Sequence, residues 1–103
     1  TYKDNFGRTF LHMAAKSAMP PVVAILLKRG LDVNAQDGNG FTPLHWAIME
    51  GYGGRHVKTA LELLKYKPDL NLKEMGGKTI LNFAIQQERD DIVKLLQDYA
   101  APK

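Results

Sequence analysis

The sequence predicts an all-α protein, a solenoid of three helix–turn–helix repeats joined by turns. The first observation is a short motif that occurs three times, around Thr9, Thr42 and Thr79. The second is the threonine itself, because a threonine hydroxyl at the start of an apolar-periodic segment caps a helix N-terminus. The third is that one such unit is too thin to bury its own apolar face. Successive units therefore have to stack.

The motif has a defined period. Segment 4–12, DNFGRTFLH, aligns with segment 37–45, DGNGFTPLH, at an offset of 33 residues, and segment 74–82, EMGGKTILN, follows 37 residues later. The second repeat therefore has four extra residues, which we place between its two helices, around 52–56. We expect a single domain over residues 1–103, with repeats at about 4–36, 37–73 and 74–103.

Each repeat has signals for two helices. Pro43 follows Thr42 and suits a first helical position, where no backbone donor is needed. The second helices are predicted around the apolar segments 22–27, 61–64 and 92–96. Gly30 suits the left-handed residue that ends a helix. Lys67 stands at the same place in the second repeat, so the sequence does not predict the conformation of that exit turn.

The 33-residue period and the segment TPLHWA at 42–47 resemble the ankyrin-repeat family, over nearly the whole chain. The resemblance implies that His12 and His45 join the motif turn to neighbouring backbone. It also implies a non-catalytic module that binds other proteins. Asn82 departs from the motif histidine and Gln97 from a second-helix leucine, as expected of the polar outer face of a terminal repeat.

Composition narrows the classes of partner. The net charge of +3 favours an acidic protein partner. The basic residues are scattered rather than gathered into a stripe, so we expect no nucleic acid. No apolar stretch is long enough to span a bilayer, and we expect no membrane association. We also expect a monomer when the chain is free. Because the chain has no cysteine, cytoplasmic and periplasmic or secreted locations are both compatible with it.

We find no constellation for catalysis, a cofactor or a metal ion. His56 is the one histidine outside the motif positions, and no second ligand accompanies it at a metal-binding spacing. The segment 76–79, GGKT, ends like a phosphate-binding loop, but Leu72 stands where such a loop needs its first glycine. We therefore expect no enzyme activity and no cofactor.

The resemblance implies that the turns between repeats are hairpin-like finger loops. It also implies that partners bind a concave surface made by the finger tips and the exposed faces of the first helices. Aromatic, Met and Arg side chains are favoured at such interfaces. The expected partner-binding residues are Phe6, Arg8, Lys16, Asn39, Phe41, Trp46, Met49, Glu50, Tyr52, Arg55, Lys73, Met75, Lys78 and Gln86.

Several of these residues have a structural alternative. Phe6 and Phe41 could fold back and pack against their own fingers, and Trp46 suits the core as well as a contact. Tyr52 could pack against the end of its helix. We place the centre of the surface on the second repeat, which offers Phe41, Trp46, Met49 and Tyr52.

The effect of binding is open to two interpretations. If no other domain is attached, the module has nothing to recruit, and its simplest effect is to block the protein it binds. We therefore favour an inhibitor or immunity-type protein that occludes a partner enzyme. The alternative is a scaffold or adaptor fragment of a larger multidomain protein.

Overall fold

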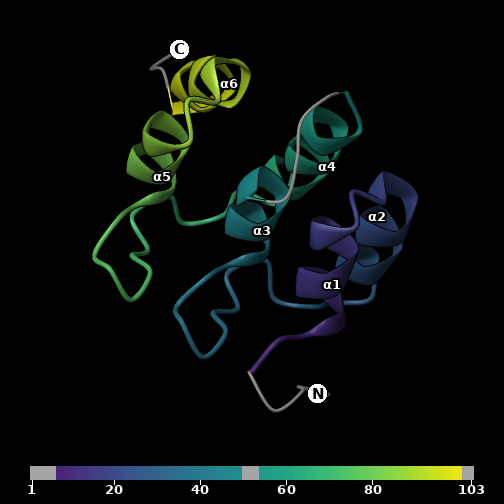
Figure 1. Ribbon diagram of the computed structural model, residues 1–103. Coiled ribbons are helices and arrows are strands. Elements are labelled where there is room, and N and C mark those ends of the chain that lie inside the picture. The colour runs from purple at the N-terminus through teal and green to yellow at the C-terminus, as the bar shows by residue number, and fades with distance from the viewer. Residues whose placement is uncertain (1–6, 50–53, 101–103) are drawn as a thin grey trace.

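The computed structural model describes residues 7–49 and 54–100, which form six helices in three pairs (Figure 1). The first helices of the pairs lie side by side, the second helices form another layer, and the long loops project from one edge (Figure 1). Over the described ranges no residue is in a strand. The predicted all-α repeat solenoid is confirmed. The helices are α1 Phe10–Lys16, α2 Pro20–Lys28, α3 Pro43–Met49, α4 Gly54–Leu64, α5 Ile80–Gln86 and α6 Asp90–Ala100.

The motif threonines cap the first helices as predicted. The backbone N–H of His12 donates to Thr9 Oγ1 at 3.4 Å, and Thr9 N–H donates back to His12 Nδ1 at 3.0 Å. Histidine thus takes the place that glutamate or glutamine holds in a capping box. Thr42 repeats this arrangement with its own histidine, and Thr79 Oγ1 accepts from Asn82 N–H at 3.3 Å.

A single apolar core runs through all three repeats. Alanines at the facing positions of the first helices let neighbouring helices approach closely. Leucine and isoleucine side chains fill the space between the two helical layers. The buried core residues are Leu11, Ala14, Ala15, Val23, Leu27, Leu44, Ala47, Ile48, Ala60, Leu63, Leu64, Ile80, Phe83, Ala84, Ile92 and Leu96.

The exit turns of the first two repeats have the same shape although their residues differ. Gly30 has φ 90° and its N–H donates to Leu27 O at 3.0 Å. Lys67 has φ 52° and its N–H donates to Leu64 O at 3.1 Å. The lysine therefore adopts the left-handed conformation that glycine occupies without steric cost.

The additional residues of the second repeat mostly lengthen a helix. By the 37-residue offset Pro20, the start of α2, corresponds to Val57, yet α4 begins at Gly54. Placing Arg55 and His56 between the helices was therefore wrong, because helical bonding continues through them. Thr59 Oγ1 even donates to the Arg55 carbonyl, at 2.7 Å.

A buried arginine joins the third repeat to the second. Arg89, in the loop between α5 and α6, is 2% exposed, and its Nη1 donates to Ile48 O at 3.0 Å. Its Nε also donates to Asp91 Oδ1 at 3.3 Å. The pKa of Asp91 lies below its ordinary value. Burial alone would raise this pKa, but hydrogen bonds from Arg89 and from the backbone of Ile92 lower it by more.

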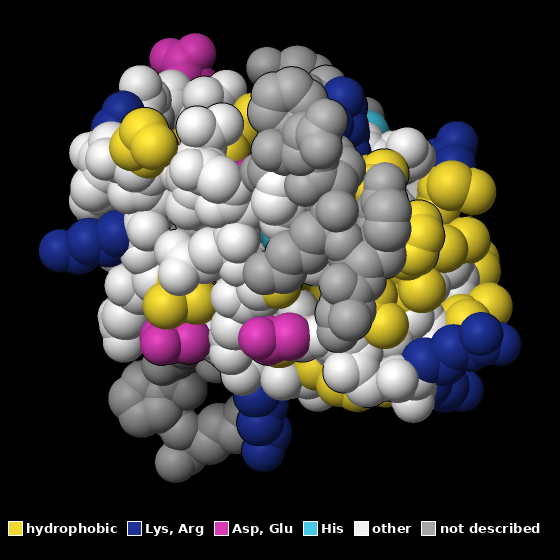
Figure 2. All heavy atoms as spheres, turned by 90° about the horizontal axis from the view of Figure 1, so that it is seen from below, with side chains coloured by type: hydrophobic (Ala, Val, Ile, Leu, Met, Phe, Trp, Pro, Cys, Tyr) yellow, Lys and Arg dark blue, Asp and Glu magenta, His cyan; other side chains and the backbone are white. Residues whose placement is uncertain are grey.

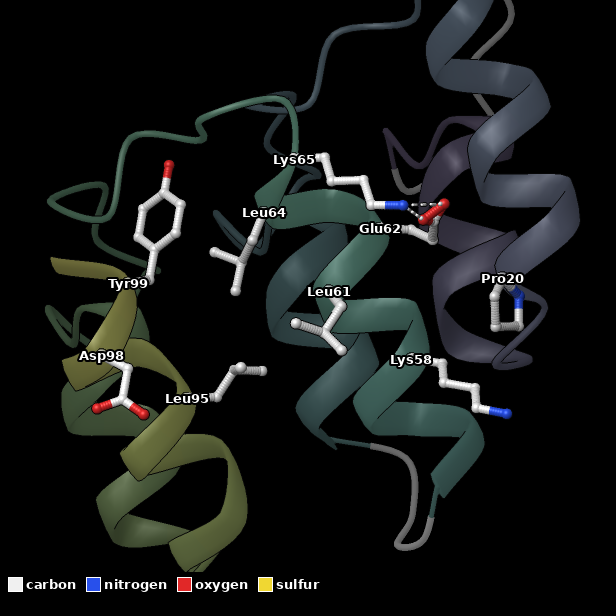
Figure 3. Close-up of a pocket in the computed structure, with 9 residues that line it drawn as sticks. All are labelled: Pro20, Lys58, Leu61, Glu62, Leu64, Lys65, Leu95, Asp98 and Tyr99. Atoms are coloured by element: carbon white, nitrogen blue, oxygen red, sulfur yellow. Dashed lines mark hydrogen bonds and ion pairs between the residues drawn. The ribbon is translucent and has the colours of Figure 1, made fainter.

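The layer of second helices is open on one side. A groove of about 680 Å³ lies between α4 and α6, and Figure 3 shows leucines from both helices pointing into it. Leu61 of α4 is 42% exposed there, although it belongs to one of the apolar segments predicted to form the second helices. Ala24 holds the same position in α2, and α4 packs more extensively on α2 than on α6. Leu61 therefore faces an open groove and not a closely packed helix.

Candidate protein-binding surface

One carboxylate organises the second finger, residues 37–41. Asp37 Oδ1 accepts from the backbone N–H groups of Asn39 and Phe41, both at 2.9 Å. Its Oδ2 accepts from the indole N–H of Trp46, also at 2.9 Å. A half-buried indole needs such an acceptor. Asp37 therefore fixes both the finger and the ring, a role that the sequence analysis missed. The signal was an aspartate at the head of a glycine turn shortly before a tryptophan.

The second finger and the third, residues 74–78, are held side by side. Met75 N–H donates to Asn39 O at 2.8 Å, and Gln36 Nε2 donates to Lys73 O, just before the third finger, at 3.0 Å. Gly40 has φ 81°, and a Cβ on it would lie 2.9 Å from the Cα of Glu74. Because that distance is a clash with backbone, only glycine allows this approach.

A hollow of about 370 Å³ lies between the two fingers. The structure brings together in it three of the predicted binding residues, Asn39, Phe41 and Met75. Met75 is 74% exposed, the highest value among the exposed large apolar side chains of the described residues. Glu74 and Gly76 complete the lining. The hollow therefore combines one exposed apolar side chain with a wall fixed by hydrogen bonds.

Phe41 and Trp46 serve the fold and the surface at once. The ring of Phe41 is half-buried, with centroids 5.6 Å from His45, 5.8 Å from Trp46 and 5.9 Å from Phe83. The ammonium of Lys16 lies 5.5 Å from the Trp46 ring centroid, within the range of a cation–π contact. The packing alternative raised for these aromatic residues is therefore present, and both rings also remain partly exposed.

Basic residues lie on or beside the finger loops. The Lys78 ammonium donates to the side-chain oxygen of Gln86 and joins the third finger to α5. Lys73 is exposed in the loop that precedes this finger, and Arg8 is half-buried just before α1. Four of the predicted residues therefore lie on or beside the finger loops or on a first helix, as the resemblance implies: Arg8, Lys73, Lys78 and Gln86.

Two predicted residues lie elsewhere. Met49 ends α3 and is half-buried, and the exposed Arg55 is in the first turn of α4. This end of the second repeat is opposite to the fingers (Figure 1). The structure therefore does not bring these two side chains into the hollow. Phe6, Glu50 and Tyr52 lie outside the described residues.

His12 bridges the first and second repeats. Thr9 N–H donates to its Nδ1, so this nitrogen is the acceptor and Nε2 carries the proton of the neutral ring. His12 Nε2 then donates to the Phe41 carbonyl at 2.8 Å. The bridge between the motif turn and neighbouring backbone, which the resemblance implies, is present here.

His45 makes only the hydrogen bond to its own motif turn. Thr42 N–H donates to its Nδ1 at 3.1 Å, but its buried Nε2 has no hydrogen-bond partner among the residues that the structure describes. Burial lowers the pKa of His45 from 6.5 to about 4, although the charges of Glu74 and Asp37 raise it. His45 is therefore neutral at pH 7.

Two kinds of feature are missing from the described part of the chain. No three His, Asp or Glu side chains in it are grouped in a way that could hold a metal ion. None of its helices has the length and apolar character needed to cross a bilayer.

Comparison with known proteins decides the family. A family model described as ankyrin repeats, in three copies, matches residues 11–103. The chain belongs to the ankyrin-repeat family. Ankyrin repeats are protein–protein interaction modules, and the hollow between the fingers lies in a domain of that kind. The function of this ankyrin domain is therefore argued from its surface.

Relatives of this ankyrin domain occur in a virus, a bacterium and a vertebrate. The chain is 36% identical over 94 residues to an ankyrin repeat protein of Fowlpox virus, covering 87% of the chain and 27% of that protein. It is 34% identical over 98 residues to one of Rickettsia bellii, covering 93% and 52%. It is also 34% identical over 95 residues to the Inhibitor of Bruton tyrosine kinase of Xenopus laevis, covering 90% and 7%. The chain thus spans about half the length of these relatives or less.

Proposed function

We propose that this ankyrin domain binds a partner protein at the hollow between its second and third fingers and thereby occludes a partner enzyme. The observation that carries the proposal is Met75, 74% exposed beside the half-buried ring of Phe41. Interface anchors are apolar or aromatic side chains that become buried in a well-packed pocket. A partner side chain placed between Met75 and Phe41 would become such an anchor.

The rigidity of the fingers supports this proposal. Asp37 ties the second finger to α3, and the Met75–Asn39 hydrogen bond ties the third finger to the second. Because these contacts exist before binding, little conformational entropy is lost when a partner binds. The hollow is thus a preorganised site.

Charge supports an acidic partner. Lys73 is exposed beside the third finger, Lys78 lies on it and Lys16 lies over Trp46. Charges at the rim of an interface mainly increase the association rate and contribute less to residence time. An acidic partner would therefore bind quickly, and its binding would weaken as salt increases.

Occlusion is the preferred effect, and scaffolding is the alternative. A relative in Xenopus bears the name of a kinase inhibitor, which favours occlusion, although this chain matches 7% of that protein. The greater length of the relatives favours a scaffold, in which other domains act on what the repeats bind. In both cases the repeats supply binding and no chemistry.

The test begins with capture of the partner by the immobilised chain and its identification by mass spectrometry. Met75→Ala and Phe41→Ala should each weaken binding by more than about 1–2 kcal/mol, as anchors do. Lys78→Glu should mainly slow association. Thermal melts of each variant separate lost binding from lost folding, which matters for Phe41 because it also packs in the core.

Lys94→Ala is the matched control, because Lys94 is exposed on α6, in the other helical layer. It should bind like the parent. If Lys94→Ala abolished binding while Met75→Ala and Lys78→Glu left it unchanged, the surface would be wrongly placed. If the captured protein is an enzyme whose turnover is unaffected by a saturating amount of the chain, occlusion is excluded and the scaffold remains.

A further inference from the structure

The groove between α4 and α6 has an apolar floor. Figure 3 shows leucines of α4 across from Leu95 and Tyr99 of α6. Leu61 and Tyr99 are 42% and 36% exposed. At the position of Leu61 the first repeat has the small Ala24 and the third has the exposed Lys94. The second repeat therefore turns a large apolar side chain outward, where its neighbours have a small or a charged one.

The two edges of this groove carry opposite charges. Lys58 lies on the α4 side, where Glu62 and Lys65 form an ion pair of 2.7 Å with each other. Asp98 lies on the α6 side, and Figure 3 shows the leucines between it and Lys58. Among the described residues neither Lys58 nor Asp98 has an ion-pair partner. The apolar floor is thus flanked by one positive and one negative edge.

We propose that this groove binds an amphipathic helix of a partner protein, with a carboxylate beside Lys58 and a basic group beside Asp98. Apolar side chains at positions i, i+3 or i+4 and i+7 of that helix face Leu61 and Leu95. With its 11 residues α4 is about 16 Å long, so a helix of about three turns lies along it.

Backbone hydrogen bonding favours a helix over an extended peptide. A helix pairs its own backbone N–H and C=O groups along its middle turns. The walls of the groove are themselves helices, α4 and α6, whose backbone groups are bonded in the same way. An extended peptide would therefore leave its backbone groups unpaired against leucine side chains, which is costly once water is excluded.

Charge and shape disfavour other occupants. An anionic membrane attracts clusters of basic residues, but Glu62 and Asp98 lie beside the lysines here. A small molecule needs several converging polar groups to orient it, and the floor offers it one hydroxyl group, that of Tyr99. A second copy of this chain offers the exposed apolar residues of α2, but α2 contains no acidic residue to meet Lys58.

The groove is independent of the hollow between the fingers. It lies in the layer of second helices, whereas the fingers project from one edge of the molecule (Figure 1). The groove and the hollow share no lining residue. A helix in the groove therefore leaves the hollow free for another protein, and the two sites can be tested separately.

Selection from a library of displayed helical peptides tests the proposal. Peptides of about 16 residues are long enough to form marginal helices in water, and the library varies one face and both flanks. The parent chain is immobilised as the target. Enriched peptides should have Leu, Ile, Met or Phe on the varied face, acidic residues on one flank and basic residues on the other. Circular dichroism should show that their helix content increases when they bind.

Two substitutions in the groove should change the affinity of the enriched peptides, measured by fluorescence anisotropy. Leu61→Glu should weaken binding by more than about tenfold, because its charge faces the apolar side of the helix. Lys58→Glu makes both edges acidic and should weaken binding about threefold, as expected of an exposed charge. A peptide with two basic flanks should bind Lys58→Glu more tightly than it binds the parent. Melting curves check that both variants are folded.

Ile25→Glu is the matched control. Ile25 is 50% exposed on α2 and does not line the groove. Figure 2 shows hydrophobic side chains gathered on the side of the molecule where the first repeat lies, so a peptide attracted by apolar surface alone would bind there. The enriched peptides should bind Ile25→Glu and Met75→Ala as tightly as they bind the parent.

Four results would overturn the proposal. The first is a selection that yields no peptide able to distinguish the parent from Leu61→Glu. The second is binding without a gain of helix. The third is an equal or larger loss of affinity in Ile25→Glu or Met75→Ala; a loss in Met75→Ala would place the peptides in the hollow and support that site instead. The fourth is self-association of the parent that Leu61→Glu abolishes, which would make a second copy the occupant.

Discussion

The junction between the first and second repeats differs from the junction between the second and third, although the same motif builds both. At the first junction, His12 donates to the Phe41 carbonyl, and the small Ala24 lets α4 pack closely on α2. At the second, the buried Nε2 of His45 has no partner among the described residues, and α6 packs less extensively on α4, with a groove between them. The motif determines which residues stand at each junction. It does not by itself set how closely neighbouring repeats pack, which differs between the two junctions.

The difference has a physical cause in the spacing of the repeats. A motif histidine completes its arrangement only if the carbonyl of the next finger comes within about 3 Å of its ring. Phe41 O does so for His12, at 2.8 Å. Lys78 follows Phe41 by the 37-residue offset, and its backbone lies near enough to the His45 ring to raise the pKa of His45, but Nε2 makes no hydrogen bond like that of His12. By the packing of its helices the second junction is the weaker one, although Arg89 and the Met75–Asn39 hydrogen bond also cross it.

The largest expected effect concerns pH at the second junction. The pKa of folded His45 is about 4 against an ordinary value of 6.5, so between these pH values the unfolded chain binds a proton that the folded chain does not. The contribution of His45 to stability is therefore complete above about pH 6.5 and declines toward pH 4. The decline is at most about 3 kcal/mol, because one pKa unit corresponds to about 1.4 kcal/mol. Urea unfolding at pH 7 and at pH 4.5 measures it.

The variant His45→Asn isolates this effect, because Asn82 already occupies the equivalent position under Thr79. Its free energy of unfolding should fall less than that of the parent between the two pH values. An equal fall in both proteins would mean that other groups cause the acid sensitivity.

The second effect compares the two histidines at pH 7. His12→Asn removes a hydrogen bond across the first junction and leaves the Phe41 carbonyl without its donor. Loss of such a buried bond costs about 1–3 kcal/mol. His45→Asn removes no such bond and should cost about 1 kcal/mol less. Chemical unfolding of both variants measures the difference, and a larger loss for His45→Asn would contradict the ranking of the junctions.

The smallest effect concerns the exit turns. Lys67→Gly should raise the free energy of unfolding by about 1 kcal/mol, because it removes a side chain from a left-handed backbone conformation. Gly30→Lys is the reciprocal control: a Cβ on Gly30 meets no atom within 4 Å, so the cost there is backbone strain alone. The two variants should change the free energy of unfolding in opposite directions and by similar amounts, as measured by thermal and urea unfolding. Two changes of the same sign would show that these turns differ in more than strain.

Most of the fold was predictable because it depends on local signals. Threonine caps, the proline at the start of α3 and the 33-residue period need no knowledge of distant contacts. The exit turn at Lys67 was not predictable, because a lysine adopts positive φ only when the surrounding repeat compels it. The extra turn of α4 was hidden by the glycines in 51–54, which suggest a loop.

The candidate surface was predictable only as a set of residue types. The sequence indicated that Asn39, Phe41 and Met75 face partners, but the hollow that gathers them depends on the approach of Gly40 to Glu74. Half-burial of Phe41 likewise follows from Phe83, which comes from the next repeat. Contacts between repeats depend on packing distances, and a single sequence does not specify these.

The buried guanidinium of Arg89 has a consequence for the order of folding. A desolvated charge is costly until its acceptors are in place, and one of them, the Ile48 carbonyl, belongs to the preceding repeat. The third repeat therefore gains this contact only after the second has formed. During synthesis the chain emerges in the same order, from the first repeat to the third. Folding can thus follow translation, and the last repeat closes onto a structure that is already complete.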